Sequence, residues 1–266
     1  MNINKIKFKP LTKIDKILLA ILVIGLVIYF TAKPALVITT GRYGQGTPEQ
    51  NEMVNSILGE EDAEERFELY FQWYNVLHEL GHGIIFANSE SRPESVDEEQ
   101  LANDFAVAFW AYCGESEKLD ELESIVSYAL EHLDCPADEN TSHIDYGREN
   151  WRTKEFNTFN NYGWFQFSCV SKSLAEIRTL ESVLIEMGVK NIEIQPQKTF
   201  AYQTVGEDTV VKIIENAVTE LRGWGADIPS VYHTFSNDPN NHRITEIKNP
   251  LGILSVFYNK VSSNPK

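Results

Sequence analysis

The sequence predicts an α+β protein in three parts, and three observations lead to that prediction. The first is an uncharged apolar run at residues 17–32, which is typical of a membrane-spanning helix. The second is apolar spacing of the helical kind through most of residues 34–171, and the third is a group of strand-like segments within residues 172–266. We therefore expect a cytoplasmic tail and anchor at 1–33, a mainly helical part at 34–171 and an α+β accessory part at 172–266.

Charge excludes one class of partner. The 266 residues carry a net charge of −16, and the chain is long enough to bury a sizeable core. Five lysines and one aspartate lie in residues 1–30, so residues 31–266 hold 18 basic and 38 acidic side chains, a net charge of −20. Because nucleic-acid binding depends on neutralising phosphates with Lys and Arg, we expect no nucleic-acid partner.

The apolar run predicts a membrane anchor. Sixteen uncharged residues separate Lys16 from Lys33, including ILLAILVIGLVIYF from Ile17 to Phe30, and as a helix they would span about 24 Å. A cleaved signal peptide and a buried soluble helix are the alternatives, but no small-residue cleavage pattern follows Phe30. Since lysines precede the run, we expect a cytoplasmic N-terminus, contact with the membrane through residues 17–32, and a periplasmic or extracellular catalytic domain.

The part that follows is expected to open with a strand at Ala35–Thr40 and a helix that starts at Pro48 and ends before Gly59. A second helix begins with the acids Glu60–Asp62 and continues to about Ile85. Its apolar residues recur at helical spacing, at Leu69, Trp73, Val76, Leu77, Leu80 and Ile84.

Ser95 and Glu98 form a capping-box pattern, which predicts a third helix from Ser95 through Trp110. A further helix is expected at Lys118–Leu133. Glycine, asparagine and aromatic residues dominate Tyr146–Phe167, which we interpret as irregular structure with short strands. Further helices are predicted at Leu174–Met187, ending at Gly188, and at Asp208–Leu221, and strands are predicted at Asn191–Gln195, Thr199–Val205, Val231–Ser236, Arg243–Lys248 and Ile253–Tyr258.

The strongest functional signal is His78-Glu79-Leu80-Gly81-His82, an H-E-x-x-H sequence on the second predicted helix. Histidines four residues apart share one helix face, about 6 Å apart along the axis, so both rings can reach one metal ion. Glu79 lies beside them and can reach a metal-bound water without being a ligand. Zinc hydrolases use this arrangement, in which the glutamate acts as general base. Two hydrogen-bonded histidines on a helix surface are the alternative.

The third predicted helix offers a third ligand. Glu99 follows His82 by seventeen residues, and Asn103 lies one turn further on the same face. Glu99 could complete a two-His, one-Glu site with an open fourth position for water, and Asn103 could accept a hydrogen bond from a ligand histidine. Glu98 is the competing ligand, but we assign it the capping role.

At these residues the chain resembles a known group of enzymes. HELGHG followed by ExxANxFA, within Tyr74–Phe109, is similar to the HExxH-plus-Glu (gluzincin-like) zinc metallopeptidases. It resembles in particular a bacterial metallopeptidase family with HELGH and ExxA(N/D)xFA, and the ImmA/IrrE-type peptidases. The resemblance implies a zincin-like catalytic fold and Zn²⁺ bound by His78, His82 and Glu99. It further implies Glu79 as general base, with Asn103 supporting a ligand.

Other residues leave alternatives open. Gly81 and Gly83 flank His82, and they could give clearance to a substrate backbone or allow close helix packing. A peptidase also needs a group that stabilises the oxyanion. The candidates are His143, Tyr146, Arg148, Tyr232 and His233. One disulfide could form among the cysteines, in any of three pairings: Cys113, Cys135 and Cys169.

Together these patterns predict a membrane-anchored zinc metallopeptidase that hydrolyses peptides or proteins with a zinc-activated water and Glu79 as general base. Hydrolysis of a non-peptide amide would use the same groups. The alternative of a different class is a non-catalytic, zinc-stabilised binding module on the outer side of the membrane. An intact Glu79 favours the enzyme, because a structural site needs no base.

Overall fold

The computed structural model describes residues 35–194, 207–235 and 244–246. The chain divides into two compact units, Met1–Pro34 and Ala35–Lys266. The predicted anchor at residues 17–32 lies outside the described residues. Among the residues that are described, no helix is both long enough and apolar enough to cross a bilayer.

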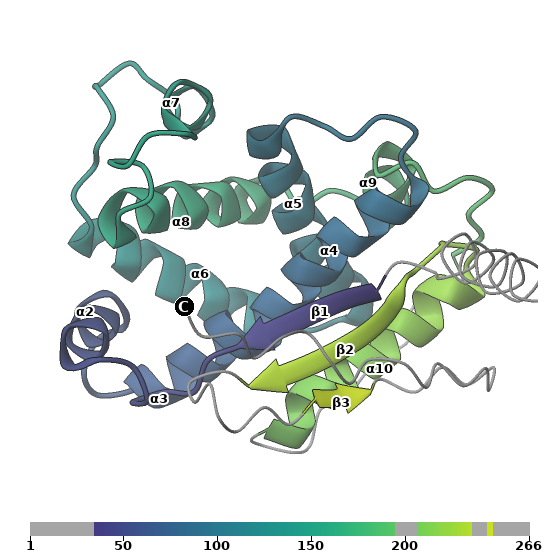
Figure 1. Cartoon of the computed structure of the whole chain (residues 1–266), viewed down its shortest axis with the longest axis horizontal. Helices are drawn as coiled ribbons and strands as arrows, with labels where there is room; N and C mark the ends of the chain where they lie inside the picture. The colour runs from purple at the N-terminus through teal and green to yellow at the C-terminus, as the bar shows by residue number, and fades with distance from the viewer. Residues whose placement is uncertain (1–34, 195–206, 236–243, 247–266) are drawn as a thin grey trace, which may run out of the picture. The chain divides into compact units, whose positions relative to one another are not determined.

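A small mixed sheet brings the beginning of the second unit together with residues 230–246. Its strands are β1 (Ala35–Thr40), β2 (Ser230–Phe235) and β3 (Ile244–Glu246), in the order β1-β2-β3. β1 runs parallel to β2, with Leu36 opposite Val231, and β3 runs antiparallel to β2. The predictions of β1 and β2 are confirmed, and β3 lies within the strand predicted at residues 243–248. Figure 1 shows α10 beside this sheet.

The predicted second helix is present, but it is not α-helical throughout. α2 (Pro48–Leu58) starts with a capping box between Thr47 and Gln50. The second predicted helix corresponds to three later segments that continue directly into one another: α3 (Ala63–Phe67), the π-helix η1 (Glu68–Tyr74) and α4 (Asn75–Asn88). The i→i+5 bonds of η1 shift the helical register, so Tyr70, Gln72 and Tyr74 are buried together with the predicted Leu69.

α5 (Ser95–Cys113) is the central helix, and it is followed by α6 (Ser116–His132). Both were predicted. The capping role of Glu98 is wrong, however. The N-cap residue is Glu94, which makes no side-chain capping bond, and the Glu98 carboxylate binds Arg92 and His82 instead. Charged partners from a preceding loop and from α4 therefore take the carboxylate away from the helix end.

Residues 146–167 are mainly helical, so the prediction of irregular structure with strands is wrong. α7 (His143–Asn150) and α8 (Phe159–Ala175) begin at the capping residues Ser142 and Thr158. Aromatic side chains from these two helices and from the turns between them form a second small core, which includes Tyr146, Phe156 and Phe165. Packing therefore outweighs the weak helix propensity of asparagine and aromatic residues. The helix predicted at 174–187 is also wrong in its extent, because α8 ends at Ala175 and α9 covers only Leu180–Glu186.

The C-terminal elements share the main core with the helical part. α10 (Glu207–Gly223), predicted at residues 208–221, packs against α4 and η1. Ile213 and Val231 belong to the same buried cluster as Leu77 and Phe105. The boundary suggested near residue 172 falls inside α8. Residues 191–194 form no strand, and the strands predicted at 199–205 and 253–258 lie outside the described residues.

The cysteines are not paired. Cys113 and Cys169 are buried, Cys135 is exposed, and all three are free thiols. None of the three possible disulfides is therefore formed.

Candidate metal centre

The three predicted ligands converge. His78 and His82 lie on α4 and Glu99 lies on α5, and one donor atom from each lies within 4.8 Å of the other two. The two Nε2 atoms are 3.2 Å apart. Glu99 Oε2 lies 3.2 Å from His78 Nε2 and 3.6 Å from His82 Nε2. This triangle of atoms could hold one metal ion.

Close packing of α4 on α5 brings the predicted ligands together, and Gly81 makes that packing possible, whereas Gly83 allows α4 to approach β1. A Cβ atom on Gly81 would lie 3.2 Å from the Cα of Ala102 on α5, and one on Gly83 would lie 2.7 Å from Leu36 on β1. Both glycines are buried. Of the two interpretations of these glycines, close packing is therefore the one that the contacts support.

Asn103 fixes the orientation and tautomer of His78. Its Nδ2 donates to the backbone carbonyl of Glu99, which can only accept, so its Oδ1 must face the other way. That Oδ1 accepts a hydrogen bond from the Tyr74 hydroxyl at 2.8 Å and contacts His78 Nδ1 at 3.0 Å. His78 Nδ1 therefore carries the proton, and His78 Nε2 presents a lone pair to the centre. The supporting role predicted for Asn103 matches this contact.

Glu98 does the same for His82, but with a charged group. His82 Nδ1 lies 2.8 Å from Glu98 Oε1, and Arg92 binds the same carboxylate through Nε and Nη2, both at 2.5 Å. A carboxylate only accepts, so His82 Nδ1 is the donor and its Nε2 is free to bind a cation. The sequence interpretation missed this role, because Arg92 lies outside the helix that Glu98 was expected to cap.

The centre therefore has three electron-pair donors that face one another. Burial lowers the pKa of His82, but hydrogen bonds with Glu98 and Glu99 outweigh it and raise the pKa to about 10. Burial likewise favours the neutral form of Glu99, but the two histidines lower the pKa of its carboxyl well below the usual range. Without a metal ion, a proton on His82 supplies the positive charge that this cluster needs.

Glu79 lies next to the ligands and is not bound by them. Its side chain is half-buried and lines a cavity of about 350 Å³ together with His78 and Asn103. Within the part of the chain that the structure describes, its carboxylate makes no hydrogen bond. It is therefore available to exchange a proton with a molecule in the cavity.

α8 provides two polar residues that the sequence interpretation missed. Gln166 Nε2 donates to Glu99 Oε2 and to the Tyr162 hydroxyl, both at 2.8 Å. Burial, with a smaller contribution from the Glu99 carboxylate, raises the pKa of Tyr162, so its hydroxyl keeps its proton. The only signal in the sequence was the four-residue spacing of these two residues, which has meaning only if the segment is helical.

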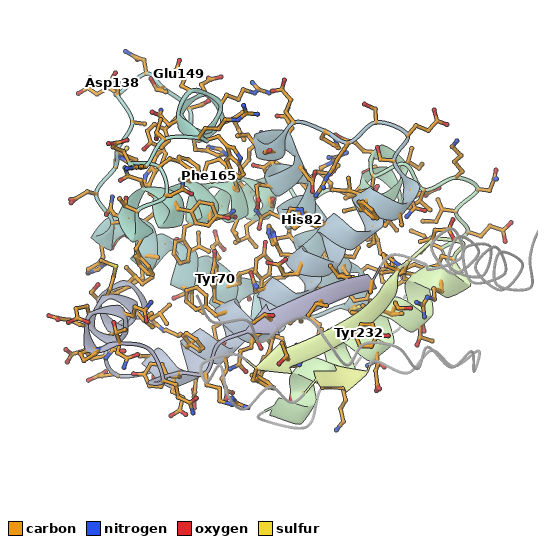
Figure 2. The ribbon with its side chains drawn as sticks, viewed as in Figure 1. Tyr70, His82, Asp138, Glu149, Phe165 and Tyr232 are labelled. Atoms are coloured by element: carbon orange, nitrogen blue, oxygen red, sulfur yellow. The ribbon has the colours of Figure 1, made fainter. Side chains whose placement is uncertain are left out.

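The five predicted oxyanion-stabilising candidates lie elsewhere, and none is among the described residues that line the cavity. His143 contacts Gln100, Tyr146 is buried in the second core, and Arg148 pairs with Asp97. His233 is buried against Thr40 in the sheet, and Tyr232 lies half-buried on β2. Figure 2 shows Tyr232 on the sheet and His82 on α4.

Comparisons with family models, with curated proteins and with solved structures found no match to this chain. The geometry of the metal centre and the H-E-x-x-H motif are therefore the features that support a function.

Proposed function

We propose that this protein is a zinc metallopeptidase whose metal is held by His78, His82 and Glu99. One observation carries the proposal: hydrogen bonds to Asn103 and Glu98 at the Nδ1 atoms turn both Nε2 atoms towards each other and towards a carboxylate oxygen. Two imidazole nitrogens and a carboxylate oxygen this close need a positive charge among them, which a proton on His82 supplies without metal and which a bound metal ion would replace. The arrangement supports a metal site over a pair of histidines hydrogen-bonded only to each other.

The separations of the donor atoms fit a tetrahedral zinc ion. Four ligands placed tetrahedrally at about 2.0–2.1 Å from an ion are about 3.3–3.4 Å from one another. The three separations here are 3.2, 3.2 and 3.6 Å. Two imidazoles and one carboxylate are also a ligand set of catalytic zinc sites, in which the fourth position stays open.

The side chains around the site have the roles that hydrolysis requires. Zinc, when bound, polarises a substrate carbonyl and makes water acidic enough to give up a proton near neutral pH. Glu79 takes a proton from the attacking water and passes it to the leaving nitrogen. Tyr162 directs its hydroxyl proton to the carbonyl oxygen as negative charge develops there, while its own oxygen accepts from Gln166. Asn103 and Glu98 hold the two imidazoles in position.

Replacing Glu79 with glutamine tests the enzyme against the non-catalytic binding module. We expect Glu79→Gln to keep about one zinc per chain and to lose at least a hundredfold in the rate of peptide cleavage, because the amide cannot accept the proton. Glu90→Gln, which changes an exposed loop carboxylate, is the matched control and should cleave normally. Equal cleavage by both variants, or none by the parent with zinc bound, would favour the binding module or another substrate.

The predicted anchor is part of the same proposal, and it is supported by the apolar run at residues 17–32 alone. We expect the full chain to remain in the membrane fraction after alkaline extraction, and its catalytic part to be cleaved by protease added outside intact cells. Release into the soluble fraction would contradict the anchor and would leave the proposed chemistry unaffected.

A further inference from the structure

The cavity beside Glu79 has walls of a different character from the metal centre. It lies between η1 and α8, and its volume of about 350 Å³ is at the lower end of the range for small-ligand sites. Its polar lining residues are His78, Glu79, Asn103 and Gln166 at the candidate metal centre, together with Asn75, Asn157 and Thr158. The rest of the lining is largely aromatic, from the two helices in equal number: Tyr70, Phe71 and Tyr74, and Phe159, Tyr162 and Phe167.

The aromatic side chains close one end of the cavity and leave the other end open to solvent. Tyr70 and Phe167 are buried, and their ring centroids are 4.5 Å apart, which seals the cavity at its base. Phe159 and Tyr162 are each 38% exposed, and they frame the entrance. The π-helix contributes to this shape, because its register presents Tyr70, Phe71 and Tyr74 to one cavity one turn before His78.

Charge limits what can enter. The described residues that line the cavity include no lysine and no arginine, and Glu79 is the one carboxylate among them. An acidic side chain would therefore enter without a partner and close to a negative charge. A basic side chain would lose its water of hydration against aromatic walls and could pair only with Glu79.

We propose that this cavity is the specificity pocket of the enzyme, and that it selects peptides with a bulky uncharged apolar side chain next to the bond to be cleaved. The inference rests on the proposed function, because the cavity is continuous with the side chains of His78 and Glu79. A ring of the phenylalanine or tyrosine type fits between η1 and α8 and contacts aromatic side chains on both helices. Burial of that ring places the neighbouring peptide bond at the metal-binding atoms.

The test uses two sets of short peptides that contain the same cleavable bond. One set varies the residue before that bond and the other varies the residue after it, and the varied residue is Phe, Leu, Ala, Asp or Lys. In the set that the zinc-loaded full chain cleaves faster, we expect the kcat/KM for the Phe peptide to be at least tenfold above that for the Ala peptide. The Asp peptide should be cleaved least. Binding of the same peptides to zinc-loaded Glu79→Gln gives a second readout that needs no turnover, and there Phe should bind at least tenfold more tightly than Ala.

Phe159→Ala opens the mouth of the pocket without removing a buried core residue. We expect the ratio of Phe to Ala cleavage to fall at least threefold in this variant. Ile185→Ala, which truncates an exposed apolar side chain on α9, should leave the ratio unchanged. Matching thermal unfolding of both variants shows that any difference arises in the pocket.

The outcomes separate the two proposals. Cleavage that needs Glu79 but does not distinguish Phe from Ala would overturn the pocket and leave the peptidase intact. Tight binding of the Phe peptide without cleavage would support the pocket and count against the peptidase. If the protein neither cleaves the peptides nor binds the Phe peptide preferentially, both proposals are overturned.

Discussion

His78 and His82 lie one turn apart on α4, and the groups that hold their rings, Asn103 and Glu98, are both buried but differ in charge and in how far their own contacts extend towards the surface. His78 is supported by a neutral amide, Asn103, which is 1% exposed and also binds the hydroxyl of Tyr74. His82 is supported by a carboxylate, Glu98, whose second partner Arg92 has a side chain 57% exposed. The first support is built into the core, whereas the second extends to the surface.

Because of this difference, we expect substitutions of Asn103 and substitutions of the Glu98–Arg92 pair to affect stability and zinc affinity in different ways. Loss of the neutral support leaves buried hydrogen-bonding groups without partners, which costs folding free energy. Loss of the charged support changes the field at one ligand, and solvent and salt screen part of that change. Substitutions on the two sides should therefore differ in size and in their response to salt.

The largest effect is expected for Asn103→Leu, which keeps the volume and removes the amide. The Tyr74 hydroxyl, the Glu99 carbonyl and His78 Nδ1 each lose a partner. We expect the metal-free protein to lose about 2 kcal/mol or more of unfolding free energy, and zinc affinity to fall about 10–100-fold. Denaturant unfolding and a zinc competition titration measure the two quantities.

Tyr74→Phe is the matched control for that variant, because it removes one hydrogen bond and leaves His78 its partner. Zinc affinity in Tyr74→Phe should stay within a few-fold of the parent. An equal loss of affinity in both variants would show that packing, and not the support of His78, controls the metal.

A smaller effect is expected for Glu98→Gln. The amide oxygen can still accept from His82, but the negative charge beside the ligand is lost. We expect zinc affinity to fall about tenfold, the lower end of the range for such supporting groups. Asp97→Asn removes the neighbouring carboxylate, which pairs with Arg148 at the surface, and it should leave the affinity unchanged. If both substitutions behave alike, Glu98 does not act on His82.

The smallest effect is expected for Arg92→Gln. Because this side chain is largely exposed, its loss should cost less than about 1 kcal/mol of unfolding free energy. Zinc affinity should fall only a few-fold, and the difference from the parent should shrink in 1 M salt. Lys190→Gln breaks an exposed pair with Glu90 and serves as control. A loss of zinc affinity in Arg92→Gln that does not depend on salt would mean that the contact between Arg92 and Glu98 is shielded from solvent.

The residues of the candidate metal centre could be predicted because the geometry within each helix is local. His78 and His82 are set by one helical turn, and Glu99 and Asn103 by another, so each pair needed only the correct helix. The assignment of Glu98 failed because its partners, Arg92 and His82, come from a loop and from another helix. No helical pattern distinguishes a capping glutamate from one that an arginine of the preceding loop binds.

The pocket could not be predicted, for two physical reasons. Phe159, Tyr162 and Gln166 lie in a segment that is poor in strong helix formers, and packing of its aromatic rings, as at Phe165, makes it helical. The π-register at Tyr70 and Tyr74 likewise has no composition signal. The helical form of α8 depends on packing against Tyr146 and Phe156, and the cavity depends on η1 and α8 meeting at Tyr70 and Phe167, which are far apart in the sequence.

The central claim is that His78, His82 and Glu99 form one zinc site. It is tested most directly by measuring zinc per chain in the purified full chain, beside Glu99→Ala and Glu79→Gln. We expect about one zinc in the parent, about one in Glu79→Gln, and far less than one in Glu99→Ala. No zinc in the parent after zinc is added back, or as much zinc in Glu99→Ala as in the parent, would contradict the site.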